Sequence, residues 1–337
     1  VKRKAVSNFF KFIFLYLIFM IPFLLINNIG DFLFEFICYF FILLPIIVFY
    51  FLNLDFEYIK KLINHFKNII IVLAVISIIF YILTNMNLIQ SYDSVLLKWN
   101  HIERIQSKFN LYFMPQTKLR NSMFFTEPAM YSIFLVLALA IERSCNNNKV
   151  NKLILLFTIL TTRSTNGIIL GIIILLYDYL FLHKKNIFII ITPIILIFAS
   201  FMIFNIFSEK ILTLSYKTRI DDYIACIKAW KDYPLFGSGF MNSNHIQNYM
   251  SYFRRSNLGL SNSLFVVLAQ GGLYFLSIYL VPLFFMIKNS KKTKFQLIVI
   301  TFFILLCTTI FHYTIFALTV VAIGISYTTA IRSNAFT

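Results

Sequence analysis

Two charged residues of opposite sign stand close together in the segment from 119 to 131. Arg120 precedes Glu127 by seven residues, and Glu127 comes directly before Pro128, where an apolar run begins. Proline is well tolerated at the first position of a helix and disfavours helical geometry in the residue before it. The sequence therefore predicts a helix that starts at Pro128 with Glu127 at its N-cap. A carboxylate in that place is either an acid or base for chemistry, or a charge that offsets the positive end of the helix dipole.

Further charged residues occur between the apolar runs rather than at their centres. They are Arg163, Arg219, Asp221, Asp222, Arg254 and Arg255. Guanidinium groups bind phosphate oxygens in a bidentate way, and each charge-assisted hydrogen bond contributes about 1.5–3 kcal/mol. Arg120, Arg163 and Arg219 are therefore candidate ligands of a diphosphate at the membrane boundary. A single arginine in such a place is more often an interface anchor or a surface ion pair, and we adopt that interpretation for Arg254 and Arg255.

Group transfer from a diphosphate requires neutralisation of the leaving group and a base for the attacking hydroxyl. The candidate bases are Glu127, His245 and, third, Asp222. For His245 the alternative is a solvated loop histidine. The segments between the runs lack the spaced Asp-x-Asp pattern with which many transferases bind a metal, so we expect no metal and no other cofactor.

The composition is that of a polytopic membrane protein. Hydrophobic residues make up 60% of the 337 residues, and the mean hydropathy of +0.81 is too high for a soluble domain. The net charge of +17 would suggest nucleic acid in a soluble protein. Most of the basic residues fall in segments assigned to the cytoplasmic side, as the positive-inside rule predicts, so no nucleic-acid partner is expected. The four cysteines form no recognisable disulfide or metal pattern.

Apolar runs of span length predict a single all-α membrane domain, residues 1–337, with about ten transmembrane helices. The runs are about Phe9–Ile26, Phe32–Leu54, Ile69–Leu83, Pro128–Ile141, Leu153–Leu182, Ile187–Phe207, Ser263–Ile287 and Phe295–Ile331. Two of them count twice, because residues 161–167 interrupt one and the last is long enough to turn near His312. The first run lacks a small-residue cleavage site and is expected to remain as the first span.

The basic residues place the N-terminus inside, which leaves two large periplasmic loops at about 84–127 and 208–262. In the first loop Val95, Trp99, Ile102 and Phe109 recur at helical spacing. This spacing predicts a surface helix lying on the bilayer, or a lid packed on the spans.

The second loop contains another predicted helix, which must end before Pro234. Its apolar face consists of Ile220, Tyr223, Ile224 and Ile227. Beyond it, Gly237 and Gly239 permit tight turns and a close approach of two backbones.

Four stretches resemble the bacterial O-antigen polymerases, the Wzy family. An arginine, a short spacer and then Phe-Thr-Glu-Pro-Ala, within residues 120–129, are similar to the signature of that family at the start of a membrane helix. Thr-Thr-Arg-Ser-Thr-Asn-Gly (161–167), the stretch from Arg219 to Pro-Leu-Phe-Gly-Ser-Gly-Phe (234–240), and Ser-Asn-Ser…Gly-Gly (261–272) are similar to three others. The resemblance is at the level of motifs and extends over about residues 115–275. Ligases of the wider family usually carry a His-Asn pair where this chain has Ser261-Asn262, although His245 lies upstream.

The resemblance implies a metal-independent glycosyltransferase of the bacterial inner membrane whose active site faces the periplasm. Such an enzyme polymerises undecaprenyl-diphosphate-linked oligosaccharide repeats into O-antigen or a related surface polysaccharide, with arginines in place of a metal. It would act on this lipid-linked substrate within membrane lipid, and would work beside a flippase and a chain-length regulator.

Two alternatives stay open. One is the ligase that transfers finished polymer to the lipid A core. The other is a transporter that flips lipid-linked sugars. The scarcity of charge at the centres of the predicted spans and the length of the outer loops disfavour an ion-coupled transporter.

Overall fold

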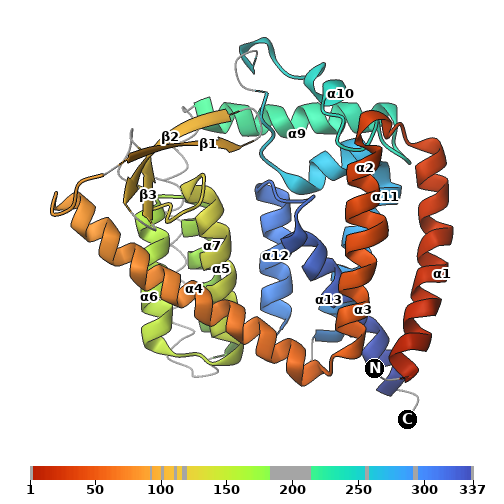
Figure 1. Ribbon diagram of the computed structural model, residues 1–337, viewed down its shortest axis with the longest axis horizontal. Coiled ribbons are helices and arrows are strands. Elements are labelled where there is room, and N and C mark those ends of the chain that lie inside the picture. The colour runs from red at the N-terminus through yellow and green to blue at the C-terminus, as the bar shows by residue number, and fades with distance from the viewer. Residues whose placement is uncertain are drawn as a thin grey trace. The chain divides into compact units, whose positions relative to one another are not determined.

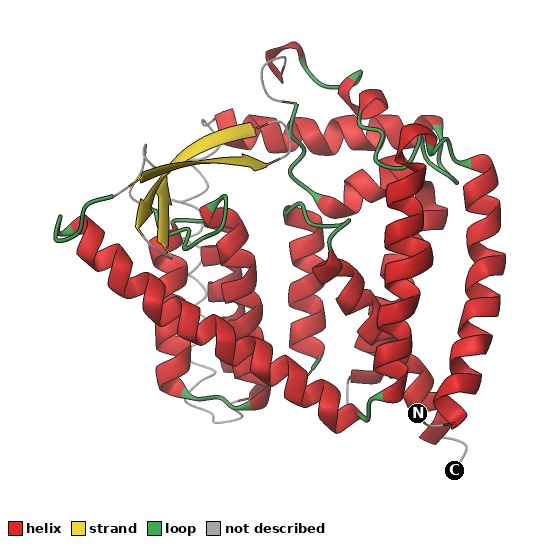
Figure 2. Cartoon of the chain, viewed as in Figure 1, coloured by secondary structure: helices red, strands yellow, loops and turns green. Residues whose placement is uncertain are grey.

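The structure is a computed structural model that describes residues 3–91, 93–99, 102–109, 112–115, 120–182, 214–254, 258–290 and 295–334. Helices predominate, and one small sheet accompanies them (Figures 1 and 2). The chain divides into two compact units, Val1–Leu62 with Thr218–Thr337, and Ile63–Lys217. The long helix α4 (Phe56–Asn85) begins in the first unit and continues into the second.

The first unit contains helices from both ends of the chain. They are α1 (Arg3–Ile26), η1 (Gly30–Phe32), α2 (Leu33–Phe36), the π-helical segment η2 (Ile37–Leu43), α3 (Leu44–Asn53), α9 (Leu214–Asp232), α10 (Asn244–Gln247), η3 (Tyr252–Arg254), α11 (Ser263–Ser290), α12 (Gln296–Thr308) and α13 (Ile315–Asn334). Within this unit α11 packs on α12 and α13, and α3 packs on α1 and α13.

Buried aromatic rings form the core of the first unit. The ring centroids of Phe23 and Phe275 are 4.6 Å apart, those of Phe40 and Phe275 are 4.8 Å apart, and those of Phe36 and Phe240 are 4.9 Å apart. Pairs at such distances contribute about 0.5–1.5 kcal/mol beyond their area burial. Because Phe240 belongs to the predicted second outer loop, these contacts fix that segment to the helices.

The second unit contains α5 (Pro128–Cys145), α6 (Lys149–Thr162) and α7 (Thr165–Leu182), which pack on one another. At the end of α5 farthest from Glu127, Lys67 of α4 and Glu142 form an ion pair of 2.9 Å, and both side chains are buried. The backbone N–H of Asn148 also donates to Glu142, at 2.9 Å. The buried charges are therefore compensated, as a low-dielectric environment requires.

The prediction of a polytopic helical membrane protein is confirmed. Five helical segments of the described residues are long and apolar enough to cross a membrane: Ala5–Ile26, Gly30–Asn53, Phe56–Asn85, Pro128–Cys145 and Ser263–Lys288. Shorter apolar helices cover Thr165–Tyr177, Gln296–Thr308 and Ile315–Tyr327. The predicted turn near His312 separates α12 from α13, and the interruption at 161–167 separates α6 from α7. The predicted span Ile187–Phe207 lies outside the described residues.

The predicted surface helix in the first outer loop is wrong. That segment forms an antiparallel sheet in the order β1 (Asp93–Trp99), β2 (Ile102–Phe109), β3 (Tyr112–Pro115). Trp99 pairs with Ile102, and Phe109 pairs with Tyr112. The spacing of four between Val95 and Trp99 is even, so it fits one face of a strand as well as one face of a helix. Only two residues separate β1 from β2 in the sequence, which is typical of a hairpin.

Candidate functional site

Helix α5 begins where the proline predicts. Pro128 occupies the first turn, and Glu127 is the N-cap with extended backbone angles, φ −139° and ψ 142°. The half-buried Glu127 side chain makes no capping hydrogen bond to the helix, so its carboxylate is not used to satisfy the helix end. The sheet contacts Thr126, the residue before Glu127. The side-chain amide of the buried Gln106 of β2 donates to the Thr126 carbonyl at 2.7 Å.

Arg120 lies against the break between α6 and α7. Its Nε donates to the Thr162 carbonyl at 3.0 Å, and its Nη2 donates to the Arg163 carbonyl at 3.1 Å. Arg163 ends α6 in the left-handed region, with φ 49°, and its side chain is exposed. A cation beside the last carbonyls of a helix is favoured by the helix dipole. Two of the stretches with a family resemblance are therefore in contact, and they bring two candidate arginines together.

Asn121 stabilises this contact through a network of hydrogen bonds. Its buried side-chain amide donates to the hydroxyls of Ser77, at 3.1 Å, and Thr161, at 3.0 Å, and its backbone N–H donates to the Thr161 carbonyl. The Ser77 hydroxyl in turn lies 3.0 Å from the hydroxyl of Tyr131 on α5. This network holds Arg120 and Glu127 on one framework. Apart from the position of Asn121 beside the arginine, no sequence pattern indicates this network.

Helix α9 carries Arg219 and ends at Asp232, before Pro234 as expected. Its small buried residues Ala225, Cys226 and Ala229 pack with residues of α10 and α11. Ile220 and Ile224 of the predicted apolar face are largely exposed instead. The Arg219 Nη1 donates to the carbonyl of Thr308, the last residue of α12, at 3.2 Å. Among the described residues this is the one hydrogen bond that Arg219 makes, so most of its N–H donors remain for a ligand.

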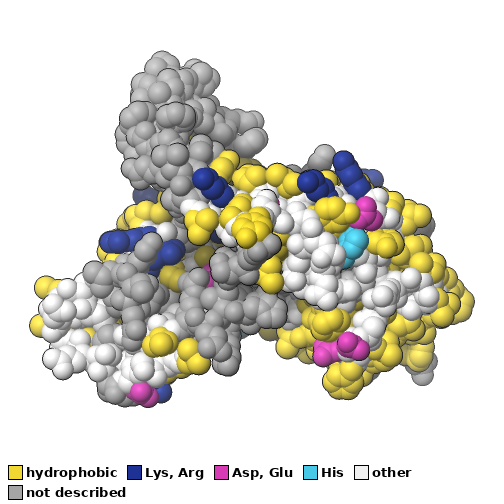
Figure 3. Space-filling view, turned by 90° about the horizontal axis from the view of Figure 1, so that it is seen from above, with side chains coloured by type: hydrophobic (Ala, Val, Ile, Leu, Met, Phe, Trp, Pro, Cys, Tyr) yellow, Lys and Arg dark blue, Asp and Glu magenta, His cyan; other side chains and the backbone are white. Residues whose placement is uncertain are grey.

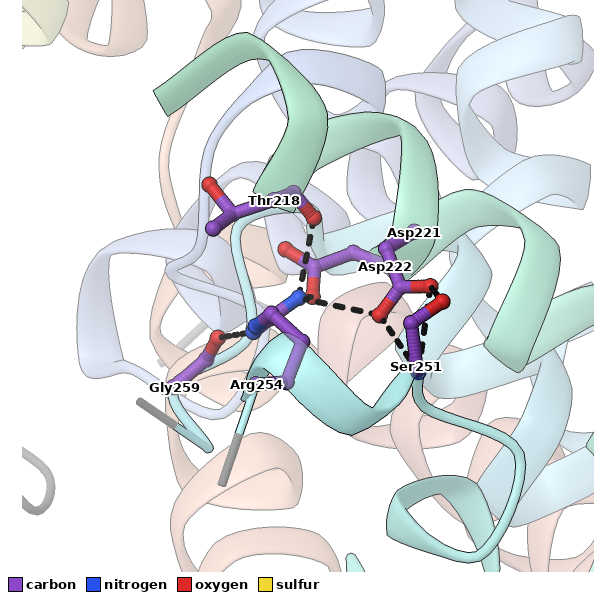
Figure 4. Close-up of polar contacts among 6 residues, drawn as sticks. All are labelled: Thr218, Asp221, Asp222, Ser251, Arg254 and Gly259. Atoms are coloured by element: carbon purple, nitrogen blue, oxygen red, sulfur yellow. Dashed lines mark hydrogen bonds and ion pairs between the residues drawn. The ribbon is translucent and has the colours of Figure 1, made fainter. Parts of the chain in front are cut away.

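Asp222 and Arg254 form a buried ion pair of 2.6 Å (Figure 4). The Arg254 guanidinium also donates to the carbonyls of Thr218, at 2.9 Å, and Gly259, at 2.6 Å. Burial raises the pKa of Asp222 above its ordinary value, and the guanidinium acts in the opposite direction. Arg254 is only 1% exposed, so the expectation of an interface anchor or surface ion pair is wrong for this residue. Arg255 lies outside the described residues.

Helix α11 is interrupted at Gly272, which has φ 65° and ψ −172°, and backbone from residues 234–239 fills the interruption. The N–H groups of Ser238 and Gly239 donate to the carbonyls of Ala269 and Gln270. The N–H groups of Leu273 and Tyr274 donate to the carbonyls of Pro234 and Leu235. The broken helix therefore regains the hydrogen bonds that a membrane environment makes obligatory.

Glycines permit this close approach of two backbones. Gly237 has φ 75°, and a Cβ there would collide with the backbone of Gln270. Gly239 has φ 136°, and a Cβ there would lie 2.6 Å from the Asn28 carbonyl oxygen. The buried Asn27 side chain completes the junction, because it donates to the Phe236 and Gln270 carbonyls and accepts from the Phe240 N–H. Two further stretches with a family resemblance are thus joined.

His245 is not an isolated loop residue. Its Nε2 lies 2.8 Å from Oδ2 of Asp232, and the Tyr249 hydroxyl donates to the same oxygen at 2.6 Å. These hydrogen bonds, that of Tyr249 first, lower the pKa of Asp232 and keep it a carboxylate. Sequence reasoning named His245 but missed Asp232, since thirteen residues separate them.

The candidate residues therefore fall into three groups. Arg120, Glu127 and Arg163 belong to the second unit, while Arg219 and Asp222 share one part of α9 in the first unit. His245 lies at the far end of α9, at Asp232. The described residues hold no cluster of three or more His, Cys, Asp or Glu that could bind a metal ion. Figure 3 shows a face on which charged and histidine side chains are exposed among apolar ones.

The apolar helices, together with arginines placed at helix ends, define a polytopic helical membrane protein. Residues 150–280, less than half of the chain, match a family model described as O-antigen ligase. The match supports the resemblance to the O-antigen polymerase/ligase-like family, without distinction between the two activities. Members of that family are glycosyltransferase-like enzymes that act on lipid-linked oligosaccharides in a membrane. No curated protein and no solved structure matches the chain.

Proposed function

We propose that this protein is the polymerase of the family and joins undecaprenyl-diphosphate-linked oligosaccharide repeats at the periplasmic face of the inner membrane. The main support for this proposal is the absence of a histidine. Ligases usually have a histidine directly before the asparagine at the start of α11. Here Ser261 occupies that position. The upstream histidine, His245, is hydrogen-bonded to Asp232. Asp232 follows Arg219 by thirteen residues on α9, which places the two about 20 Å apart along the helix axis.

A base must lie within hydrogen-bond distance of the hydroxyl that it activates. At such a separation His245 is too far from a diphosphate held by Arg219 to act at the glycosidic bond of the same sugar. The ligase pattern is therefore incomplete in this chain. Asp222 is also a poor base, because its carboxylate is already paired with Arg254.

In the proposed reaction arginines bind substrate diphosphates, Arg120 and Arg163 in the second unit and Arg219 in the first, and Glu127 is the base. The hydroxyl at the non-reducing end of the acceptor attacks the anomeric carbon of the growing chain. The bond between that carbon and the diphosphate oxygen breaks, its electron pair leaves with the diphosphate, and the hydroxyl proton passes to Glu127. The arginines stabilise the charge on the leaving group, which is the function that a metal has in other transferases. Glu127 is a candidate for this role because it lies half-buried at the start of α5, directly before Pro128.

Deletion of the gene tests this proposal. A host without the polymerase should display lipopolysaccharide whose core carries a single repeat, because the ligase still transfers unpolymerised units. Gel electrophoresis of lipopolysaccharide from the deletion strain and the complemented strain measures this. A core without any repeat, with polymer retained on the lipid carrier, would instead identify the protein as the ligase.

A further inference from the structure

We propose that the C-terminal end of α9 carries a saccharide-binding subsite, formed by Asp232, His245 and Tyr233, that holds the substrate glycan several sugars away from the diphosphate. This inference rests on the proposed function, because the substrate must be a lipid-linked oligosaccharide. The subsite is distinct from the residues that would carry out the transfer.

The polar groups of the subsite are both fixed and accessible. Asp232 Oδ2 accepts from His245 and Tyr249, which leaves its Oδ1 and the Nδ1 of His245 without a hydrogen bond to any other described residue. The two side chains are 38% and 26% exposed. A carboxylate oxygen and an imidazole nitrogen held side by side can both accept hydrogen bonds from neighbouring hydroxyl groups of one sugar ring.

An aromatic wall borders these polar groups. Tyr233 is 52% exposed, and its ring centroid lies 5.3 Å from that of His245, with an angle of 67° between the two ring planes. The ring centroid of Tyr249 lies 5.6 Å from that of His245. A few fixed polar groups beside rigid aromatic surface are typical of small-ligand sites. The apolar faces of sugar rings are suited to such a wall, whereas a membrane lipid would need a continuous apolar surface.

The position on α9 determines which part of the substrate would bind. Arg219 and Asp232 belong to one unbroken helix and are separated by about 20 Å along its axis. A glycan whose diphosphate is bound by Arg219 therefore extends past its first sugar before it reaches Asp232. The subsite would consequently contribute to recognition of the repeat and to retention of the chain, but not to the chemical step.

A binding experiment with the free glycan tests this proposal. The host's own lipid-linked repeat accumulates in a polymerase-deficient strain, and mild acid releases the oligosaccharide from the diphosphate. Saturation-transfer NMR titration with the purified full-length protein then measures affinity for this free oligosaccharide. Asp232→Asn and Tyr233→Ala should each weaken binding at least about tenfold, as expected for loss of one charged hydrogen-bond partner or of one aromatic contact surface.

The control is Ile224→Ala, on the same exposed face of α9 and eight residues before Asp232, which should bind like the parent. Tyr233→Ala leaves the Asp232–His245 pair intact, so it decides the question even if Asp232→Asn lowers stability. Unchanged affinity in Tyr233→Ala would overturn the proposal. Free-glycan binding that depends on Tyr233, in a protein that transfers no sugar, would uphold the subsite while refuting the proposed polymerase.

Discussion

Replacement of Arg120 or Arg219 by lysine is expected to reduce polymer formation at least about a hundredfold at normal protein abundance. Lysine keeps the positive charge but loses the planar fork that binds two phosphate oxygens at once. The loss of two charge-assisted hydrogen bonds in the transition state costs about 3–6 kcal/mol, and this corresponds to a hundredfold or more in rate. Densitometry of polysaccharide ladders, with immunoblots for abundance, measures both quantities.

The structure also supplies a competing explanation, because both arginines donate to carbonyls at helix ends. Apparent melting temperatures of the detergent-solubilised variants separate the two. Arg143→Lys, the same change at the opposite end of α5 from Glu127, is the matched control and should leave polymer formation near normal. Near-normal polymer from Arg120→Lys and Arg219→Lys would mean that these residues are anchors rather than phosphate ligands.

Breaking the Asp222–Arg254 pair is expected to destabilise the first unit by about 3–5 kcal/mol, because one buried charge is left without its partner. Arg254→Met should have the larger effect, since Asp221 and Asp222 would then face each other without the guanidinium (Figure 4). The double variant Asp222→Asn with Arg254→Met should be less destabilised than the sum of the single variants. Apparent melting temperatures of the purified proteins give this cycle.

Lys228→Met is the control for that cycle, because Lys228 is exposed on the same helix. Its melting temperature should match that of the parent. A normal melting temperature for Asp222→Asn together with complete loss of polymer formation would contradict the structural assignment. It would return Asp222 to the candidate bases.

Local chemistry explains which features could be predicted from the sequence. Pro128 fixes the start of α5, and Pro234 limits α9, because proline acts on its own backbone and on the residue before it. The two glycines of the second outer loop correctly indicated close backbone approach for the same kind of reason. Long apolar runs identify membrane helices, since only a helix satisfies its own backbone in lipid.

The features that were missed depend on contacts between distant segments. The burial of Arg254 depends on Asp222, thirty-two residues earlier, and no periodic pattern encodes that pairing. The interruption of α11 at Gly272 is filled by backbone from residues 234–239, and no local pattern in the sequence indicates which two segments meet there. The sheet of the first outer loop was mistaken for a helix because a few apolar positions satisfied both periods. Asp232 gained a candidate role only when the fold placed it beside His245.

The most direct test of the central claim is a reaction that contains only the purified protein and the lipid-linked repeat, with no lipid A core. Because a polymerase uses this one compound as both donor and acceptor, we predict a ladder of lipid-linked products that differ by one repeat. Glu127→Gln should abolish the ladder while the protein remains folded. Absence of a ladder with the parent protein, followed by glycan transfer when lipid A core is added, would contradict the account and identify a ligase.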